Sequence, residues 1–444
     1  MASMPEVAKL RRELGLRDVT LFAIACIVGV RWIPAAAHAG PHSIALWLLA
    51  AVFFVVPLAI AVGTLTAKYP GSGSLYSWTR GDFGPWHGFL CFWIYWMSIA
   101  FWFPSAAMFY MSVAVYTLGP AYAHLADHRG YMVAAALVAI WIALGTNLIG
   151  VKIGKWTENL GGAATWVIGG IFLSVAALAW IRRGSATVFN IVPHWDLGTL
   201  NLGAATIAFA MTGLELVAMM GAEIRNPERT VRRAGWISSA FAALFYSSMT
   251  AALLVLLPPA KISERQGLAQ GGEVAAQLLG TPWLSPLIAI VILMTGLGQF
   301  GGLGSAASRL PFAVGVDKLL PAAFAKVHPR WGTPHVSILT MGGVASLLLI
   351  VFQLGDTMGA AYDGLVSMTV IAGFIPYIYV FGSSWKAGHR ISALGGWAVS
   401  VIALVCSVVP TSEVSSVWLY EFKLAAGTGA VIGSAWLVYR QSKR

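Results

Sequence analysis

The stretch LFAIACIVGVRWIPAAAHAGP, from Leu21 to Pro41, decides the fold class of this chain. It is apolar and long enough to cross the ~30 Å hydrocarbon core of a membrane, yet Arg31 stands at its middle, between Gly29 and Pro34. An arginine at the centre of a spanning helix costs ~2.5–3.5 kcal/mol. Irregular backbone at that depth is tolerated only where it is buried in protein or lines a cavity. The stretch therefore predicts a membrane helix that breaks at its middle.

The rest of the chain repeats the apolar part of this pattern. Of its 444 residues, 58% are hydrophobic and 10% are charged, whereas soluble proteins carry about 25% charged residues. The composition predicts an all-α polytopic membrane protein with about 12 transmembrane helices. The expected spans are 19–40, 43–67, 86–118, 131–150, 159–181, 201–223, 235–257, 285–308, 335–353, 360–383, 391–410 and 416–438.

The net charge of +11 reflects topology. Most of the 28 Lys and Arg residues fall in the two tails and the even-numbered connections, which is the positive-inside pattern. We therefore expect a multi-pass protein of a prokaryotic-type cell (inner) membrane with both termini cytoplasmic. The basic residues would meet anionic lipid headgroups, and no nucleic-acid partner is expected. The first 18 residues are too polar for a cleavable signal peptide.

A second broken span follows five spans after the first. In NLGAATIAFAMTGLELVAMMGAEIRNPER, Gly213 is followed by Glu215. Interrupted helices at corresponding positions indicate an inverted repeat with a binding site near the midplane. The sequence thus predicts one transmembrane domain over 1–444, made of a cytoplasmic tail (1–18), two five-helix repeats (19–183 and 201–384) and helices 11–12 (391–440).

The sequence contains few motifs that are typical of catalysis, metal binding or cofactor binding. Cys26, Cys91 and Cys406 are scattered within spans and indicate neither a disulfide framework nor a metal site. The GLGQFG of Gly296–Gly301 satisfies G-x-G-x-x-G, but it lies inside a span without a preceding strand, which favours helix packing over dinucleotide binding. With no paired catalytic carboxylates or Ser/His constellation at one depth, we expect no enzyme activity, no cofactor and no metal.

Four blocks carry a family resemblance: IVGVRWIP with HAGP; AKYPGSGSLYSWTRGDFGPWHGFLCFWIYW; GLE with GAEIRNPERTVRRA; and SAASRLPFAVGVDKLLP. In these blocks and their order the chain resembles the amino acid–polyamine–organocation (APC) superfamily of secondary transporters. FFVVPLAIAVGTL and WMSIAFWFPSAAMFY look most like its glutamate/γ-aminobutyrate antiporter branch. The resemblance implies a LeuT-type fold, alternating access, and an amino acid or related amine held between the breaks of spans 1 and 6.

The breaks supply the predicted binding site. Backbone N–H and C=O groups freed where a helix unwinds can meet a ligand's charged groups; alternatively, Gly29 and Gly213 only let helices pack closely. Glu215 is either a polar group beside the pathway or a brace for the unwound backbone. The candidate substrate-binding residues are Val28, Gly29, Val30, Arg31, Trp32, Tyr95, Phe209, Met211, Thr212, Gly213, Leu214 and Glu215.

Arg31 has three candidate roles. Its planar guanidinium could bind a substrate carboxylate through two hydrogen bonds. It could instead pair with Asp363 as an outer gate, as in LeuT-type symporters, or form a structural ion pair with Glu215. In each case a fixed positive charge disfavours polyamine substrates. Many members of the superfamily that the chain resembles have a second glycine where Arg31 stands.

Gating and ion coupling complete the expectations. Trp96 and Tyr362 are aromatic gate candidates, with Trp102 and Tyr246 as further aromatic candidates, and Glu223 and Arg309 are expected in a cytoplasmic gate. Ser305 and Ser308 could bind sodium, whereas Thr165 stands where proton-coupled relatives carry a lysine. The coupling sodium ion or proton is left open. The alternatives to an amino acid permease or antiporter are a sodium- or proton-coupled symporter of another small organic solute, a channel, or a membrane enzyme.

Overall fold

The computed structural model describes residues 14–69, 74–149, 151–354, 357–410, 414 and 416–443, without the side chains of 151–155, 219–223, 313 and 316. These residues form helices and no named strand; one isolated bridge joins Leu14 to Ile224. The all-α prediction is therefore confirmed.

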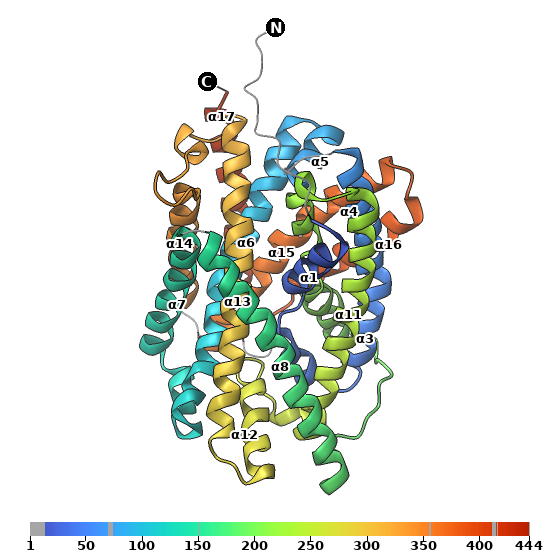
Figure 1. The fold of residues 1–444 in the computed structure, drawn as a ribbon, viewed down its shortest axis with the longest axis vertical. Helices are drawn as coiled ribbons and strands as arrows, with labels where there is room; N and C mark the ends of the chain where they lie inside the picture. The colour runs from blue at the N-terminus through green and yellow to red at the C-terminus, as the bar shows by residue number, and fades with distance from the viewer. Residues whose placement is uncertain are drawn as a thin grey trace.

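The helices follow the predicted spans closely (Figure 1). In the described part of the chain, ten helices are long and apolar enough to cross a membrane, and one bent pair adds an eleventh span. The 17-residue apolar helix α16 occupies the remaining predicted position. The uninterrupted spans are α6 (Pro85–Ala114), α7 (Arg129–Ile149), α8 (Val151–Arg183), α11 (Pro227–Leu256), α13 (Leu284–Val316), α14 (His335–Gln353), α15 (Met358–Lys386), α16 (Arg390–Cys406) and α17 (Val417–Gln441), while span 2 runs through α3 (Ser43–Ala50), the π-helical η1 (Ala51–Val55) and α4 (Val56–Lys68).

The opening stretch breaks where its sequence predicts. Helix α1 (Leu16–Ile27) and helix α2 (Trp32–Ala39) meet at an angle of 57°. The break begins at Val28, whose extended backbone (φ −82°, ψ 110°) ends α1. Pro34 falls in the first turn of α2, where its missing N–H leaves no helical hydrogen bond unmade. Arg31 therefore lies just before the start of a second helix.

Span 6 is interrupted too. It runs through α9 (Leu197–Leu200), the π-helical η4 (Asn201–Ile207) and α10 (Ala208–Ala210), and resumes as a 3₁₀ segment, η5 (Leu214–Glu223). Gly213, in between, has φ +113°, a conformation that residues with a Cβ rarely adopt. Both predicted breaks are thus present, and the division into two five-helix repeats stays a prediction.

Two helices outside the spans mark opposite ends of the molecule, α5 (Ser74–Phe83) and α12 (Gly267–Leu279) (Figure 1). The sequence places them on opposite sides of the membrane. Helix α12 packs on α13 through its glycine and alanine face, where Gly272 lies against Ile288. Val274, on another side of the helix, is only partly buried.

Helices α8 and α13 cross in close contact. A Cβ on Gly161 would lie 2.4 Å from Gly298 Cα and 2.7 Å from Gly298 N. Both are backbone atoms, so neither can move aside cheaply. Gly298 of GLGQFG therefore serves helix packing, as the sequence predicts.

We expect Gly161→Ala to destabilise the protein by about 1–3 kcal/mol, the usual cost of overpacking. Gly162→Ala is the matched control, because a Cβ there meets nothing within 4 Å. Thermal unfolding of the purified variants compares them, and equal melting temperatures would contradict the close α8–α13 crossing.

Candidate functional site

The two breaks touch each other at the centre of the molecule. A Cβ on Gly213 would lie 2.9 Å from the carbonyl oxygen of Cys26, on the last turn of α1. Gly213 is therefore needed both for its positive φ and for this close approach. The contact brings the freed backbone of both spans into one region.

Tyr246 of α11 holds the two breaks together. Its hydroxyl accepts a hydrogen bond from the Gly29 N–H (2.7 Å) and lies 2.9 Å from Ile27 O and 3.1 Å from Ala210 O. Its single proton is shared between these two carbonyls, one from each broken span. The ring is fixed by a parallel stack on Trp47, with centroids 4.2 Å apart.

Gln299 of α13 meets the first break from another side. Its side-chain amide donates to Val28 O (3.2 Å) and accepts from the Tyr110 hydroxyl (3.0 Å). A Cβ on Gly29 would lie 2.3 Å from Gln299 Nε2, so the glycine makes room for this bond. Side chains of α11 and α13 thus form hydrogen bonds with backbone groups that the sequence analysis proposed for substrate binding.

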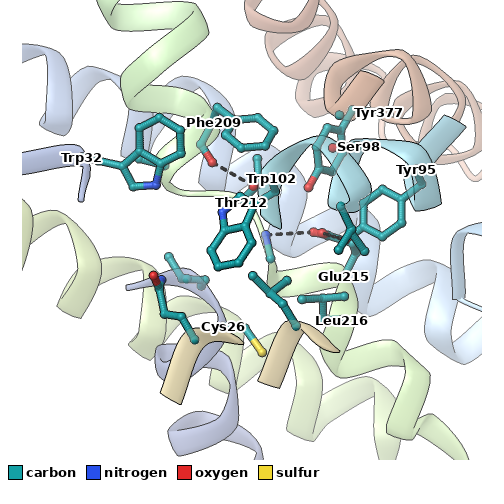
Figure 2. A pocket seen from close by; sticks show the side chains of 17 residues that line it. Cys26, Trp32, Tyr95, Ser98, Trp102, Phe209, Thr212, Glu215, Leu216 and Tyr377 are labelled. Atoms are coloured by element: carbon teal, nitrogen blue, oxygen red, sulfur yellow. Dashed lines mark hydrogen bonds between the residues drawn. The ribbon is translucent and has the colours of Figure 1, made fainter. Parts of the chain in front are cut away.

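A cavity of about 60 Å³ lies beside the two breaks (Figure 2). Figure 2 shows Trp32 and Phe209 on one side of it and Tyr95, Glu215 and Tyr377 on the other. Its walls comprise Cys26, Ile27, Trp32, Tyr95, Ser98, Ile99, Trp102, Phe209, Ala210, Thr212, Gly213, Glu215, Leu216, Gln299, Leu303, Gly373 and Tyr377.

Half of the predicted binding residues face this cavity and half do not. Those in its walls are Trp32, Tyr95, Phe209, Thr212, Gly213 and Glu215. Those buried around it without lining it are Val28, Gly29, Val30, Arg31, Met211 and Leu214. The break in span 6 thus contributes more to the cavity than the break in span 1.

Glu215 supplies the negative charge of the cavity. Its side chain is buried; Oε1 accepts from the Tyr95 hydroxyl (2.6 Å) and Oε2 from the Gly213 N–H (3.2 Å). No ion pair in the described residues includes Glu215. The carboxylate is therefore held by neutral donors, and no cation in the described part of the chain forms an ion pair with it.

Arg31 is also buried, and none of the ion pairs found in the described ranges includes it. Neither the predicted pair with Asp363 nor the one with Glu215 is present in this structure. Asp363 is buried on α15. A gate formed by Arg31 and Asp363 would have to close in another conformation.

Trp102 lines the cavity, whereas the remaining candidates with described side chains do not. Trp96 and Tyr362 are buried, Arg309 is exposed, and Glu223 lies outside the described side chains. The Ser308 hydroxyl donates to Ser305 O (2.8 Å) and the Thr165 hydroxyl to Gly161 O (2.9 Å). These are bonds within single helices, and ion coupling stays a prediction.

A network of charged side chains lies at the end of the molecule that carries α5. The Asp82 carboxylate accepts from Lys68 (2.8 Å) and from the Tyr69 hydroxyl (2.7 Å), and Asp317 accepts from Arg80 and from the Tyr76 hydroxyl. These bonds tie α5 to the ends of α4 and α13.

The Lys68–Asp82 pair should make stability depend on pH. Although burial alone raises the pKa of Asp82, the hydrogen bonds from Lys68 and Tyr69 outweigh it and hold the pKa below its ordinary 3.8. A lowered carboxyl pKa stabilises the folded state above the unfolded pKa, and this stabilisation is lost as the pH falls through the folded pKa. We expect Asp82→Asn to melt below the wild type at pH 7, with the difference shrinking below about pH 4. A difference that does not change with pH would contradict this assignment.

Comparison with known proteins places this geometry in a family. The family model described as amino acid permease matches residues 14–416. An uncharacterized transporter of Legionella pneumophila is 24% identical over 96% of each chain. A serine/threonine exchanger of Bacillus subtilis is 24% identical over 84% of this chain and 82% of its own. A methylthioribose transporter of the same species is 26% identical over 88% and 86%, respectively. With two broken spans enclosing a cavity, and with the match running over most of its length, this chain belongs to the amino acid permease family of APC-superfamily transporters.

Proposed function

We propose that this protein is a secondary active transporter that carries a small amino acid or closely related amine by alternating access. The substrate would occupy the cavity between the broken spans. The observation that carries the proposal is Glu215, a buried carboxylate that faces the cavity and has no cationic partner in the described residues. A buried charge needs a counter-charge, and a substrate ammonium group supplies one.

The size of the cavity limits the substrate. A water molecule needs about 10–15 Å³ of such space, so a cavity of about 60 Å³ has room for only a few non-hydrogen atoms in this conformation. Small amino acids such as alanine or serine fit this limit better than aromatic ones. The serine/threonine exchanger among the relatives supports the same choice and favours exchange over uncoupled flux.

The orientation that we propose has both termini on the cytoplasmic side of the inner membrane. The C-terminal end of α17 and α5 lie at the same end of the molecule (Figure 1). The Lys and Arg residues concentrated in the even-numbered connections support a cytoplasmic position for that end. No covalent chemistry and no cofactor are part of the proposal; a sodium ion or a proton remains the candidate coupling ion.

A neutral polar solute is the second candidate. The aromatic walls formed by Trp32, Trp102 and Phe209 suit stacking on a sugar ring, and one relative is a methylthioribose transporter. Such a solute would use the aromatic walls and would not need the charge of Glu215.

Proteoliposome transport tests the proposal. The protein is reconstituted and given a panel of labelled amino acids, amines and methylthioribose, with and without a sodium gradient, a proton gradient and internal substrate. We expect saturable uptake of a small amino acid that internal substrate accelerates. Uptake of methylthioribose alone would favour the second candidate, non-saturable flux would indicate a channel, and the absence of flux for every solute would refute the proposal.

A further inference from the structure

The guanidinium of Arg31 is buried with most of its hydrogen-bonding capacity unused. The side chain is 1% exposed, and Nη1 donates to the Ser105 hydroxyl of α6 (2.9 Å). Nε and Nη2 are buried and have no hydrogen-bond partner. A buried charge without a counter-charge is strongly unfavourable, and each unmade hydrogen bond adds to that cost.

Two indole rings cover the guanidinium. Its central carbon lies 4.0 Å from the ring centroid of Trp32 and 5.2 Å from that of Trp102. Such cation–π contacts stabilise the charge in part, but they satisfy none of the N–H groups that lie in the guanidinium plane. What is missing is an acceptor in that plane, which a carboxylate or a small anion provides.

Among the described residues, the surroundings of Arg31 contain hydroxyl groups and no anion that forms an ion pair with it. Tyr110, Tyr246 and Tyr362 lie near enough to interact with its charge. The Tyr110 hydroxyl donates to Gln299 and that of Tyr246 to backbone carbonyls. The Ser105 hydroxyl donates to Trp102 O (2.9 Å) while it accepts from Arg31. The protein thus fixes the orientation of the guanidinium without neutralising it.

The same two indoles contact both Arg31 and the cavity. Trp32 and Trp102 line the cavity, whereas Arg31 does not. A movement of either ring would therefore expose the guanidinium to whatever occupies the cavity. Glu215 lies across the cavity from Trp32 (Figure 2), so the two buried charges flank the same space.

We propose that Arg31 and Ser105 form an anion subsite behind Trp32 and Trp102, which takes a single carboxylate or a small monovalent anion when an indole moves aside. In one alternative, which rests on the proposed function, the carboxylate belongs to the transported solute. In the other, the anion is a free anion from solution. In the first case the substrate bridges Glu215 and Arg31 with its two charges. In the second case a resident anion neutralises Arg31 while the substrate binds elsewhere in the cavity.

Thermal unfolding of the purified full-length protein tests the subsite without reference to transport. Three proteins are compared: the wild type, Arg31→Gln and the control Arg265→Gln. The control removes an arginine that is paired with Asp127. Each protein is melted in sodium acetate, sodium chloride and sodium sulfate at equal ionic strength. We expect acetate, or acetate and chloride, to raise the melting temperature of the wild type and of Arg265→Gln by several degrees over sulfate, and to leave Arg31→Gln unchanged. Equal responses of all three proteins would mean a general salt effect and would overturn the proposal.

Binding measurements then identify the source of the anion. Serine is compared with ethanolamine, and alanine with ethylamine, which lack the carboxylate. If the solute supplies the carboxylate, Arg31→Gln weakens binding of the amino acids at least tenfold and leaves the amines within twofold. If the anion is free, the wild type binds both classes only when chloride or acetate is present, and Arg31→Gln loses this dependence.

Arg31→Lys keeps the test decisive if Arg31→Gln does not fold. Lysine retains the positive charge but lacks the planar guanidinium, whose paired N–H donors match the two oxygens of a carboxylate. We expect its melting response to acetate to fall at least threefold. An unchanged response to acetate would show that the guanidinium does not bind the anion.

Discussion

Replacing Glu215 by glutamine is expected to weaken binding of the transported amine by roughly 10- to 150-fold, because hydrogen bonds to charged groups contribute about 1.5–3 kcal/mol. Glutamine keeps the shape of the side chain and one acceptor oxygen for Tyr95 or the Gly213 N–H. The change therefore removes charge more than structure. Equilibrium binding to the purified protein measures it.

Glu228→Gln is the matched control, since Glu228 is exposed in the first turn of α11. It should bind the amine like the wild type. If Glu215→Gln also binds normally, Glu215 is only a brace for the unwound backbone of span 6. If it loses amines but retains a neutral sugar, the ammonium assignment holds and the cavity accepts both classes.

Tyr246→Phe is expected to produce the largest loss of stability among the single changes considered. It leaves three buried backbone groups, Gly29 N–H, Ile27 O and Ala210 O, without their hydroxyl partner. Each unsatisfied buried group costs about 1–3 kcal/mol. We expect a melting temperature lower by several degrees and a severe loss of transport, because nothing else in the described residues joins both breaks through one atom.

Tyr439→Phe serves as the control. Tyr439 packs through its ring against Trp86 and Phe89, and phenylalanine preserves that packing. Melting and uptake are measured on both variants. Wild-type behaviour of Tyr246→Phe would show that the hydroxyl does not hold the breaks together.

The spans and breaks could be predicted from the sequence because their causes are local. A run of apolar residues fixes a membrane helix regardless of its neighbours, and Gly29 and Gly213 mark the points where the backbone leaves the helix. Glu215 could be placed in the site for the same reason, since a charge beside a break needs a polar environment.

The partners of the freed backbone could not be predicted from the sequence. Tyr246 was an aromatic candidate for sealing the pathway, and nothing in its own helix shows that its hydroxyl reaches two other helices. Gln299 was missed altogether. An amide in the middle of an apolar span needs a hydrogen-bond partner, which could have indicated Gln299. The GLGQFG pattern, however, was interpreted only through its glycines.

Arg31 shows the same limit. Sequence patterns predict three candidate partners for it, all of them carboxylates: the substrate's, Asp363 and Glu215. The structure gives it Ser105 and two tryptophans. Trp32 is its chain neighbour, but Trp102 comes from α6, and only the packing of α6 against the broken span brings it there.

Substrate protection of Cys26 tests the central claim most directly, namely that the transported solute occupies the cavity between the broken spans. Cys26 lines the cavity and is partly exposed, whereas Cys91 and Cys406 are buried. In a variant with Cys91→Ala and Cys406→Ala, the rate at which a small methanethiosulfonate reagent modifies Cys26 is measured with and without the transported solute. We predict that saturating solute slows the modification at least fivefold and that a non-transported analogue does not. A modification rate unchanged by saturating transported solute would contradict the account.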